Sequence, residues 1–343
     1  MTLIKTGKFE LTRKKPNNLK STQYENFEHE LFRKFSSPKI FTRKNIYVHQ
    51  QKLWKFKYFN AYSDHWRMSN FWYKHKLSLF YRNLMNAALN RDEIKYDIIS
   101  KASWVVDQKS WKYMHWFSDA MQRIQHLEKF LNEYPVIIFR HYENYEYIKY
   151  TLKRLEIPHI VLERENYYLV KELLISSHVA PSGNYHEILI NNVSSRLKEN
   201  IEVRNSQPSE NIWISRQKAT IRKVVNNKEL QKILKKYDFR EIILEDLSFE
   251  EQVNILSRAK ILAGIQGAGL TNILFMKEET SLLEVRSVED ASNNCYFSLA
   301  SALNIKYFYS DAFVNQDKGG SHSGNYEIDI NDLEKSIISI LNL

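Results

Sequence analysis

The feature that most constrains the fold is a regular alternation of short apolar runs with helical patterns. Apolar runs of strand length occur at residues 211–216, 240–245, 260–265, 281–286 and 305–310. Segments of helical length separate them, at residues 226–237, 248–259, 267–276 and 293–303. Ser248 and Glu251 have the spacing of a capping box at the start of one of these segments. The alternation predicts βαβ units, and therefore a parallel sheet with helices on both faces.

A weaker alternation precedes it, with predicted strands at 134–140 and 159–163 and a predicted helix at 142–155. The length of 343 residues favours two hydrophobic cores, and the polar stretch 194–210 is the best linker. We therefore predict a chain of class α/β with three parts. These are an N-terminal domain (1–205), a second domain (206–320) and a C-terminal helix (321–343) that could return to the first domain.

Three of the eight glycines, Gly264, Gly267 and Gly269, lie within six positions. Gly267-Ala268-Gly269 follows a predicted strand and opens a predicted helix. Glycine lets backbone N–H groups approach a ligand, and a helix N-terminus favours negative charge, so phosphate is the expected ligand. The cluster matches neither the dinucleotide fingerprint nor a Walker motif. Close packing of helix on strand explains the glycines equally well.

Two arginines and one carboxylate extend this pattern. In a parallel sheet, Arg216 at the end of its strand lies on the same edge as the Gly267 turn, and Arg222 follows six residues later. Guanidinium groups suit phosphate oxygens, and such a pair could neutralise a diphosphate without a metal ion. Two solvated arginines are the plain alternative. Glu284 interrupts an apolar strand and could accept sugar hydroxyls, or could form an ion pair with Arg286.

A second motif lies upstream in "YMHWFSDAMQR", residues 113–123. If this segment is helical, His115 and Asp119 share one face, because they are four residues apart. A carboxylate there could orient or charge the imidazole. The alternative is that His115 and Trp116 pack in the core and that Asp119 is a surface acid paired with Arg123.

Taken together, these motifs resemble glycosyltransferase family 61, which contains capsular-polysaccharide and plant xylosyl- or arabinosyltransferase-like proteins. The resemblance covers about residues 104–309, and both blocks agree in order and separation. The matching residues of the second block are Ser215, Arg216, Arg222, Asn226, Phe249, Gln252, Gly267 to Asn272, and Glu284. Those of the first block are Tyr113, His115, Trp116, Asp119 and Arg123.

The resemblance implies a GT-B fold: two Rossmann-like domains that face a central cleft, with the acceptor in the first and the nucleotide sugar in the second. It also implies an inverting enzyme that needs neither a cofactor nor a metal held by Asp-x-Asp. We expect Asp119 to be the catalytic base, with His115 as second choice. The expected donor-binding residues are Arg216, Arg222, Gln266, Gly267, Ala268, Gly269, Leu270, Thr271, Asn272 and Glu284. Gln266 departs from the family, which usually has His there, and this could alter donor choice or rate.

Composition limits the expected partners. Lys and Arg number 50 against 40 Asp and Glu, and this surplus favours phosphate-bearing partners. We expect a nucleotide sugar and a glycan or glycolipid acceptor, as in capsule or lipopolysaccharide synthesis. One cysteine (Cys295), no signal-peptide pattern and no long apolar run favour a cytoplasmic protein, with contact to the inner membrane face still open. Alternative functions are nucleic-acid binding, which no recognised motif supports, and a catalytically silent scaffold, suggested by Gln266.

Overall fold

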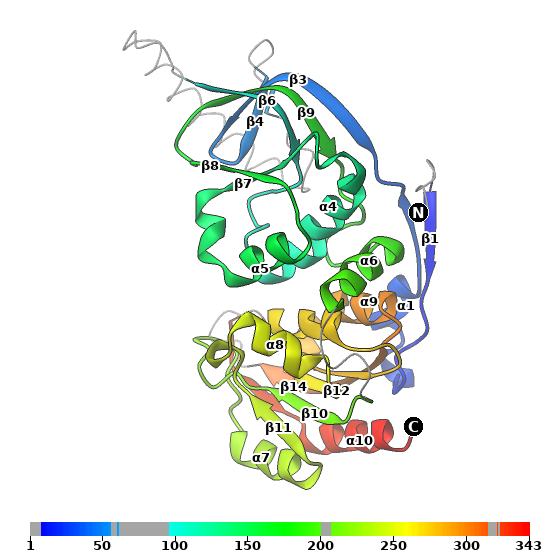
Figure 1. The fold of residues 1–343 in the computed structure, drawn as a ribbon. Coiled ribbons are helices and arrows are strands. Elements are labelled where there is room, and N and C mark those ends of the chain that lie inside the picture. Colours follow the sequence, from blue (N-terminus) through cyan, green and yellow to red (C-terminus); the bar gives the residue numbers. More distant parts are fainter. Residues whose placement is uncertain (1–7, 56–59, 62–95, 200–206, 315–320, 322) are drawn as a thin grey trace.

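The computed structural model describes residues 8–55, 60–61, 96–199, 207–314, 321 and 323–343 (Figure 1). Its two large sheets lie in opposite halves of the molecule, with helices between them and further helices on the far side of one sheet (Figure 1). The chain is therefore a mixed α/β protein. One of its large sheets is mainly parallel, and in the other, half of the strand pairs are parallel and half antiparallel. The GT-B assignment in particular remains a prediction. No helix among the described residues is long and apolar enough to cross a membrane.

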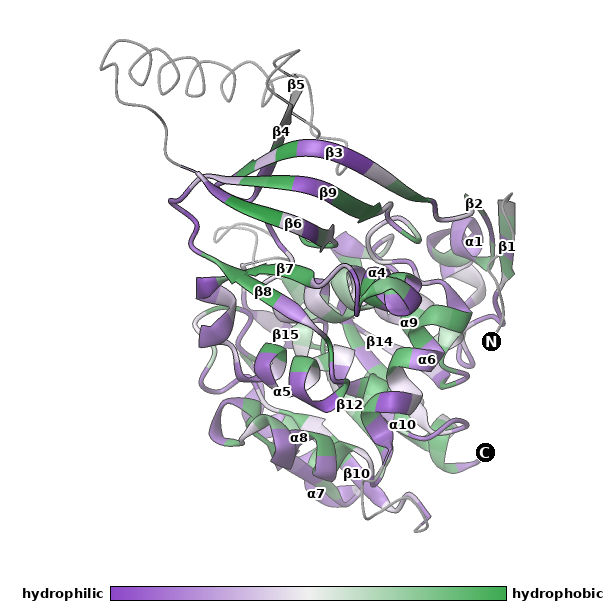
Figure 2. Ribbon diagram, turned by 45° about the horizontal axis from the view of Figure 1, so that its top comes forward, coloured by the Kyte–Doolittle hydropathy of each residue, from purple (hydrophilic) through white to green (hydrophobic). Residues whose placement is uncertain are grey.

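The first sheet has the strand order β5-β4-β3-β9-β6-β7-β8. Its parallel part consists of β6 (Asp97–Trp104), β7 (Val136–Phe139), β8 (His159–Leu162) and β9 (Tyr168–Ser176). An antiparallel part adds β3 (Ile40–His49), β4 (Lys52–Lys55) and β5 (Asn60–Ala61). Every residue of β7 is apolar and buried (Figure 2), as expected of a parallel strand covered on both faces.

Helical segments connect these strands. Residues 113–127 form one continuous run that consists of α3 (Tyr113–His115), a π-helical turn η3 (Trp116–Ala120) and α4 (Met121–Leu127). The 3₁₀ segments η4 (Glu128–Phe130) and η5 (Arg140–Asn144) and the helix α5 (Glu146–Arg154) follow. Helix α6 (Glu187–Lys198) occupies the first residues of the predicted linker 194–210, so that linker begins later than predicted. Residues 200–206, where we placed the domain boundary, lie outside the described residues.

The second sheet confirms the predicted alternation. Its order is β11-β10-β12-β13-β14-β15, and only β15 is antiparallel to its neighbour. The strands are β10 (Glu210–Ile214), β11 (Phe239–Ile242), β12 (Ala259–Ile265), β13 (Ser281–Ser287), β14 (Lys306–Val314) and β15 (Tyr326–Ile328). The helices are α7 (Asn227–Lys236), α8 (Phe249–Leu256), α9 (Cys295–Ala302) and α10 (Ile330–Leu341), with short 3₁₀ segments η7 (Leu244–Asp246) and η9 (Val288–Asp290).

Local signals in this half are confirmed with one exception. Ser248 and Glu251 form both bonds of the capping box at the start of α8. The segment after Gly267, however, is a 3₁₀ helix, η8 (Ala268–Phe275), and not an α-helix. Cys295 is buried, and burial raises the pKa of its thiol, which agrees with a packing role.

Each sheet has one point at which its strand order reverses. In the second sheet the chain runs from β10 outward to β11 and then returns past β10 to β12. In the first sheet it runs from β6 through β7 to β8 and returns to β9 on the other side of β6. Ligands of open α/β sheets bind beside the carboxyl ends of the strands at such switch points.

The N-terminal segment crosses to the second sheet. The hairpin-like pair β1 (Lys8–Thr12) and β2 (Phe32–Ser36) brackets the 3₁₀ turn η1 (Ser21–Gln23) and α1 (Glu25–Leu31). Asn17 N–H donates to the Tyr307 carbonyl of β14, and the Lys20 ammonium lies 2.7 Å from carboxylate oxygens of both Asp311 and Asp332. Helix α10 packs on β13, β14 and α7. Through Asp332 it also contacts the N-terminal segment, so that segment and the C-terminal helix hold each other on the second sheet.

Candidate active site

The arginines and the glycine loop meet at the switch point of the second sheet. Arg216 follows the carboxyl end of β10, and Gly267 follows that of β12, the neighbouring strand. A Cβ atom placed on Gly267 would lie 2.9 Å from Nη1 of Arg216 and 3.6 Å from Nη1 of Arg222. Both guanidinium groups therefore lie against the glycine backbone, on the edge that parallel pairing predicts.

Neither of these cations forms an ion pair with a carboxylate among the described residues, although the more distant charge of Glu245 acts on Arg216. Arg216 donates through Nε to the Arg222 carbonyl (3.1 Å) and through Nη2 to the Ile221 carbonyl (3.2 Å). Arg222 donates through Nη1 to the Gln266 carbonyl (2.8 Å), and its Nε is buried without a bond. Burial, and after it the positive charge of Arg222, lowers the pKa of Arg216. Two neighbouring cations held only by carbonyl oxygens are an incomplete electrostatic arrangement that an anion would complete.

The backbone of Arg222 supports this interpretation. Its φ angle is +58°, in the left-handed region that residues other than glycine rarely adopt. Such a conformation costs about 1–3 kcal/mol and persists where the surroundings enforce it, commonly at ligand sites. Here the strained backbone turns the Arg222 side chain toward Gln266 and Gly267.

The glycines of the loop divide between two roles. A Cβ on Gly269 would lie 3.0 Å from Leu244 Cδ1 and 3.4 Å from two atoms of Ile214, so this glycine permits close packing. Gly264 likewise faces Ile214 and Leu270. Gly267 has an extended φ of 173°, and its role is the close approach of the arginines. The packing interpretation therefore holds for Gly264 and Gly269, whereas ligand binding at Gly267 stays a prediction.

The remaining predicted loop residues differ in exposure. Ala268 is exposed, whereas the side chains of Leu270, Thr271 and Asn272 are buried. The Asn272 amide donates to the Gly269 carbonyl (2.9 Å), and its oxygen accepts from the Tyr113 hydroxyl (2.5 Å). The structure therefore gives the Asn272 side chain bonds within the protein, and of the loop residues only Ala268 is exposed and Gly269 half-buried. Gln266 is buried, and its side chain reaches the Asn293 carbonyl at 3.4 Å.

We expect Gly269→Ala and Gly267→Ala to have different effects. The added methyl at Gly269 must displace packed side chains, which should lower the free energy of unfolding by about 1–3 kcal/mol. At Gly267 the methyl meets the flexible end of Arg216, so stability should hardly change while nucleotide affinity falls. Urea unfolding and titration calorimetry on both variants test this. Equal loss of stability in both would assign both glycines to packing.

Glu284 is buried in β13 and belongs to a chain of hydrogen bonds. It is 0% exposed, and its Oε2 accepts a bond of 2.6 Å from the Tyr307 hydroxyl. That hydroxyl in turn accepts a bond of 3.2 Å from Nη1 of Arg286. The ion pair with Arg286 considered from the sequence is therefore replaced by a connection through Tyr307. Burial above all raises the pKa of Glu284 to about 7.

His115 and Asp119 are joined as the helical spacing predicts. Nδ1 of His115 lies 2.7 Å from Oδ2 of Asp119, and the Ser118 hydroxyl donates to Oδ1 at 3.1 Å. The π-helical turn contains Asp119, and such turns occur frequently at functional sites. The Asp119 side chain is 3% exposed and that of His115 17%. Asp119 is therefore not the surface acid of the alternative interpretation.

Arg123 connects the helical run that contains this pair to the switch point of the first sheet. It is fully buried and donates to the carbonyl groups of Trp104, Val105 and Ser176, at the carboxyl ends of β6 and β9. Sequence reasoning missed two residues beside it, Asp107 and His178, which approach to 3.7 Å. Their positions just after β6 and β9 could have indicated them, because strand ends carry the site in this fold class.

The first motif and the glycine loop are in contact. Tyr113 of the first motif bonds Asn272 of the glycine loop, although 159 residues separate them in the chain. Tyr296 of α9 is a second link that sequence reasoning missed: its hydroxyl lies 4.0 Å from Met114 Sδ, and its phenol is near Arg222 and Glu284. Burial raises the pKa of Tyr296 well above its ordinary value, so the phenol stays neutral.

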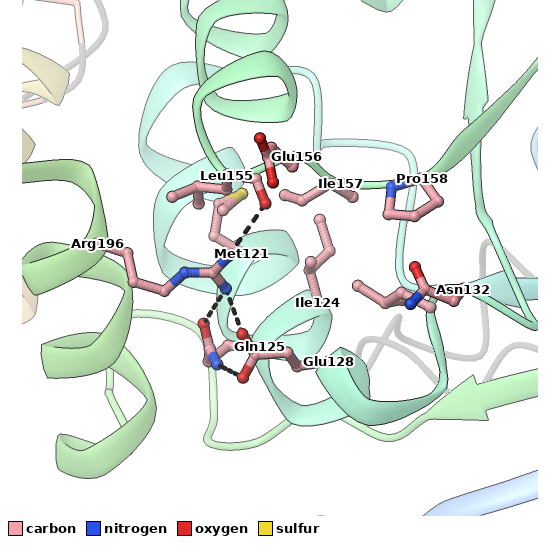
Figure 3. Close-up of a pocket in the computed structure, with 11 residues that line it drawn as sticks. Met121, Ile124, Gln125, Glu128, Asn132, Leu155, Glu156, Ile157, Pro158 and Arg196 are labelled. Carbon is pink, nitrogen blue, oxygen red and sulfur yellow. Dashed lines mark hydrogen bonds and ion pairs between the residues drawn. The ribbon is translucent and has the colours of Figure 1, made fainter. Parts of the chain in front are cut away.

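A small cavity of about 80 Å³ lies elsewhere, between α4, the turn before β8 and α6 (Figure 3). Arg196 points from α6 toward Gln125 and Glu128 and also donates to the Leu155 carbonyl. None of the predicted site residues lines this cavity. We therefore leave it out of the candidate active site.

Comparison with known proteins points to a sugar-transfer chemistry. The model of the family described as glycosyltransferase 61 matches residues 113–283. An EGF domain-specific O-linked N-acetylglucosamine transferase of Drosophila melanogaster is 33% identical over 122 residues, or 32% of this chain and 23% of its own length. The protein of that name from Rattus norvegicus is 27% identical over 243 residues, or 65% of this chain and 42% of its own length. The chain thus matches less than half the length of these relatives.

Proposed function

Because the chain belongs to glycosyltransferase family 61, we propose that it transfers a sugar from a nucleotide sugar to an acceptor hydroxyl. The observation that carries this proposal is the pair Arg216 and Arg222, two cations that form no ion pair with a carboxylate in the described part of the chain, beside Gly267 at a switch point. A nucleoside diphosphate supplies the charge that this arrangement lacks.

We propose that the diphosphate of the nucleotide sugar binds at the carboxyl edge of the second sheet, beside Arg216 and Arg222. The arginines hold the diphosphate in the ground state and stabilise the negative charge that grows on it as the glycosidic bond breaks. Two fixed guanidinium groups take the role that a metal ion has in other transferases, so we propose transfer that does not depend on metal. The front of the loop, Gly267 to Gly269, adds backbone N–H groups.

We assign the acceptance of the proton from the acceptor hydroxyl to His115 and Asp119. The acceptor oxygen attacks the anomeric carbon from the side opposite the diphosphate, which inverts the configuration, and its proton leaves to a base. The greater exposure of His115 supports the imidazole as that base, with Asp119 orienting it and stabilising its charged form. This reverses the order of the two roles expected from the sequence, and both residues remain essential.

The names of the relatives guide the choice of substrates. The first donor to test is UDP-N-acetylglucosamine, because the relatives are named as N-acetylglucosamine transferases. The acceptors to test are a glycan or glycolipid, as expected from the sequence, and a hydroxyl group of an EGF domain, because the names of the relatives refer to that domain. A glycolipid acceptor would favour the cytoplasmic face of a membrane as the site of action.

Thermal unfolding with UDP-, GDP- and CMP-sugars tests the proposal. Ligand at 100 times its dissociation constant should stabilise the protein by about 2.7 kcal/mol. We expect one nucleotide class to raise the melting temperature, and single-stranded RNA not to do so. RNA acting where no nucleotide sugar does would instead support the nucleic-acid alternative. Binding without transfer to any acceptor would support the silent scaffold.

A further inference from the structure

Arg286 is a buried arginine whose guanidinium group makes several hydrogen bonds within the protein. Its Nη1 donates to Asn294 Oδ1 (3.0 Å) and to the Tyr307 hydroxyl (3.2 Å), and its Nη2 donates to the Ala291 (2.5 Å) and Asn293 (3.2 Å) carbonyls. The guanidinium also lies 4.7 Å from the ring centre of Phe27 in the N-terminal segment. It is 3% exposed. A buried cation with this many contacts is a rigid anchor.

The donor and acceptor roles in the hydrogen bonds from Arg286 to Tyr307 and from Tyr307 to Glu284 follow from the chemistry of these groups. A guanidinium group can only donate, so the Tyr307 oxygen accepts from Arg286. The single proton of Tyr307 is then free to point only toward Glu284, whose Oε2 lies 2.6 Å away. Arg286 and Tyr307 therefore hold one oxygen of the Glu284 carboxyl group in one orientation.

The other oxygen of Glu284 has no partner. Oε1 is buried and makes no hydrogen bond. Leaving a buried polar atom unbonded costs about 1–3 kcal/mol. Glu284 is the register partner of Gly264, three residues before Gly267. Tyr296, which is near both Glu284 and Arg222, connects this residue to the arginine pair.

We propose that Arg286 and Tyr307 are positioning residues, which hold Glu284 by Oε2 so that Oε1 accepts a hydrogen bond from a hydroxyl group of the donor's sugar. This inference rests on the proposed function. It separates two tasks within the donor site: the arginine pair binds the diphosphate, and the Arg286–Tyr307–Glu284 chain recognises the sugar. A nucleoside diphosphate that carries no sugar therefore binds the arginine pair but not Glu284.

The charge on Glu284 gives the chain a measurable property. Burial raises its pKa to about 7, whereas Arg286 and the bond from Tyr307 lower it and Asp290 raises it. Cys295 and Tyr296 also face Glu284, and burial raises the pKa of both, so they stay neutral near pH 7. The carboxylate accepts a sugar hydroxyl better than the acid does, so affinity for the nucleotide sugar should rise between pH 6 and 8. Losing the Tyr307 hydroxyl should move this rise to higher pH.

The test compares Tyr307→Phe with Tyr309→Phe. Tyr309 lies two residues along the same strand and is also buried, but its hydroxyl accepts from the Lys20 N–H and does not touch Glu284. Affinities for UDP and for UDP-N-acetylglucosamine, or for the pair that stabilises the wild type in the thermal assay, are measured by calorimetry from pH 6 to 8. Glu284→Gln, which cannot titrate, completes the set.

We expect Tyr307→Phe to weaken nucleotide-sugar binding about 10-fold at pH 7, as for a lost bond to a charged group, and to move the pH midpoint upward. Its affinity for the nucleoside diphosphate should change less than about 2-fold. Tyr309→Phe should resemble the wild type, and Glu284→Gln should bind with no pH dependence. Two outcomes would overturn this inference but not the proposed function. One is an equal loss of nucleotide-sugar affinity in the two tyrosine variants, and the other is an equal loss of affinity for the nucleotide sugar and the nucleoside diphosphate in Tyr307→Phe. Failure of the wild type to bind any nucleotide sugar would overturn the proposed function with it.

Discussion

Replacing Arg216 with alanine is expected to weaken nucleotide binding by about 100-fold or more. Bonds from a charged donor contribute about 1.5–3 kcal/mol each, and a guanidinium can make two of them to a diphosphate. Each 1.4 kcal/mol is a factor of ten in affinity. Titration calorimetry with the nucleoside diphosphate measures the change directly.

The same substitution should leave the free protein as stable as before, or make it more stable. Arg216 bonds only two carbonyl groups of its own loop and repels Arg222, so removing it relieves a conflict between like charges. Arg240→Ala is the matched control. It removes the same charge from β11 of the same sheet, where the side chain is exposed and paired with Glu210. A much lower melting temperature for Arg216→Ala alone would show that the arginine is structural.

Asp119→Asn should strongly reduce the rate of transfer while nucleotide binding persists. An asparagine can occupy the same space, but it can neither charge the imidazole of His115 nor hold its proton on the required nitrogen. Because His115 then loses the group that orients and charges it, we expect turnover to fall by up to about 10²–10⁴-fold, the contribution of positioned acid–base catalysis. Initial rates at saturating donor, together with nucleotide affinity by calorimetry, separate the two effects.

Glu128→Gln is the control for this variant. It makes the same change of charge at the end of the same helical run, where Glu128 pairs with Arg196 near the surface. Its turnover should stay within about 2-fold of the wild type. If Asp119→Asn lost nucleotide binding as well, the two motifs would not divide the work as proposed. Circular dichroism of both variants checks that each is folded.

Patterns in the sequence were sufficient for the features that depend on neighbouring residues. The period of apolar residues predicted the strands and helices of the second sheet, and the spacing of Ser248 and Glu251 predicted a capping box. Parallel pairing alone placed Arg216 on the same edge as Gly267, because every strand of such a sheet ends on that edge. The spacing of His115 and Asp119 likewise predicted their contact, since residues four apart share a helix face.

Tertiary structure alone decided which residues far apart in the sequence are in contact. Tyr307 bonds Glu284 across two strands, Lys20 pairs with Asp311 from 291 residues away, and Asp107 meets His178 where two strand ends converge. The 3₁₀ form of η8 also depends on what packs on it, including the bond from Tyr113 to Asn272. Local patterns carry the conformational preferences of short segments, whereas these contacts depend on the order of strands in a sheet and on the fit of one sheet's helices against the other's. No period or spacing along the chain encodes that fit.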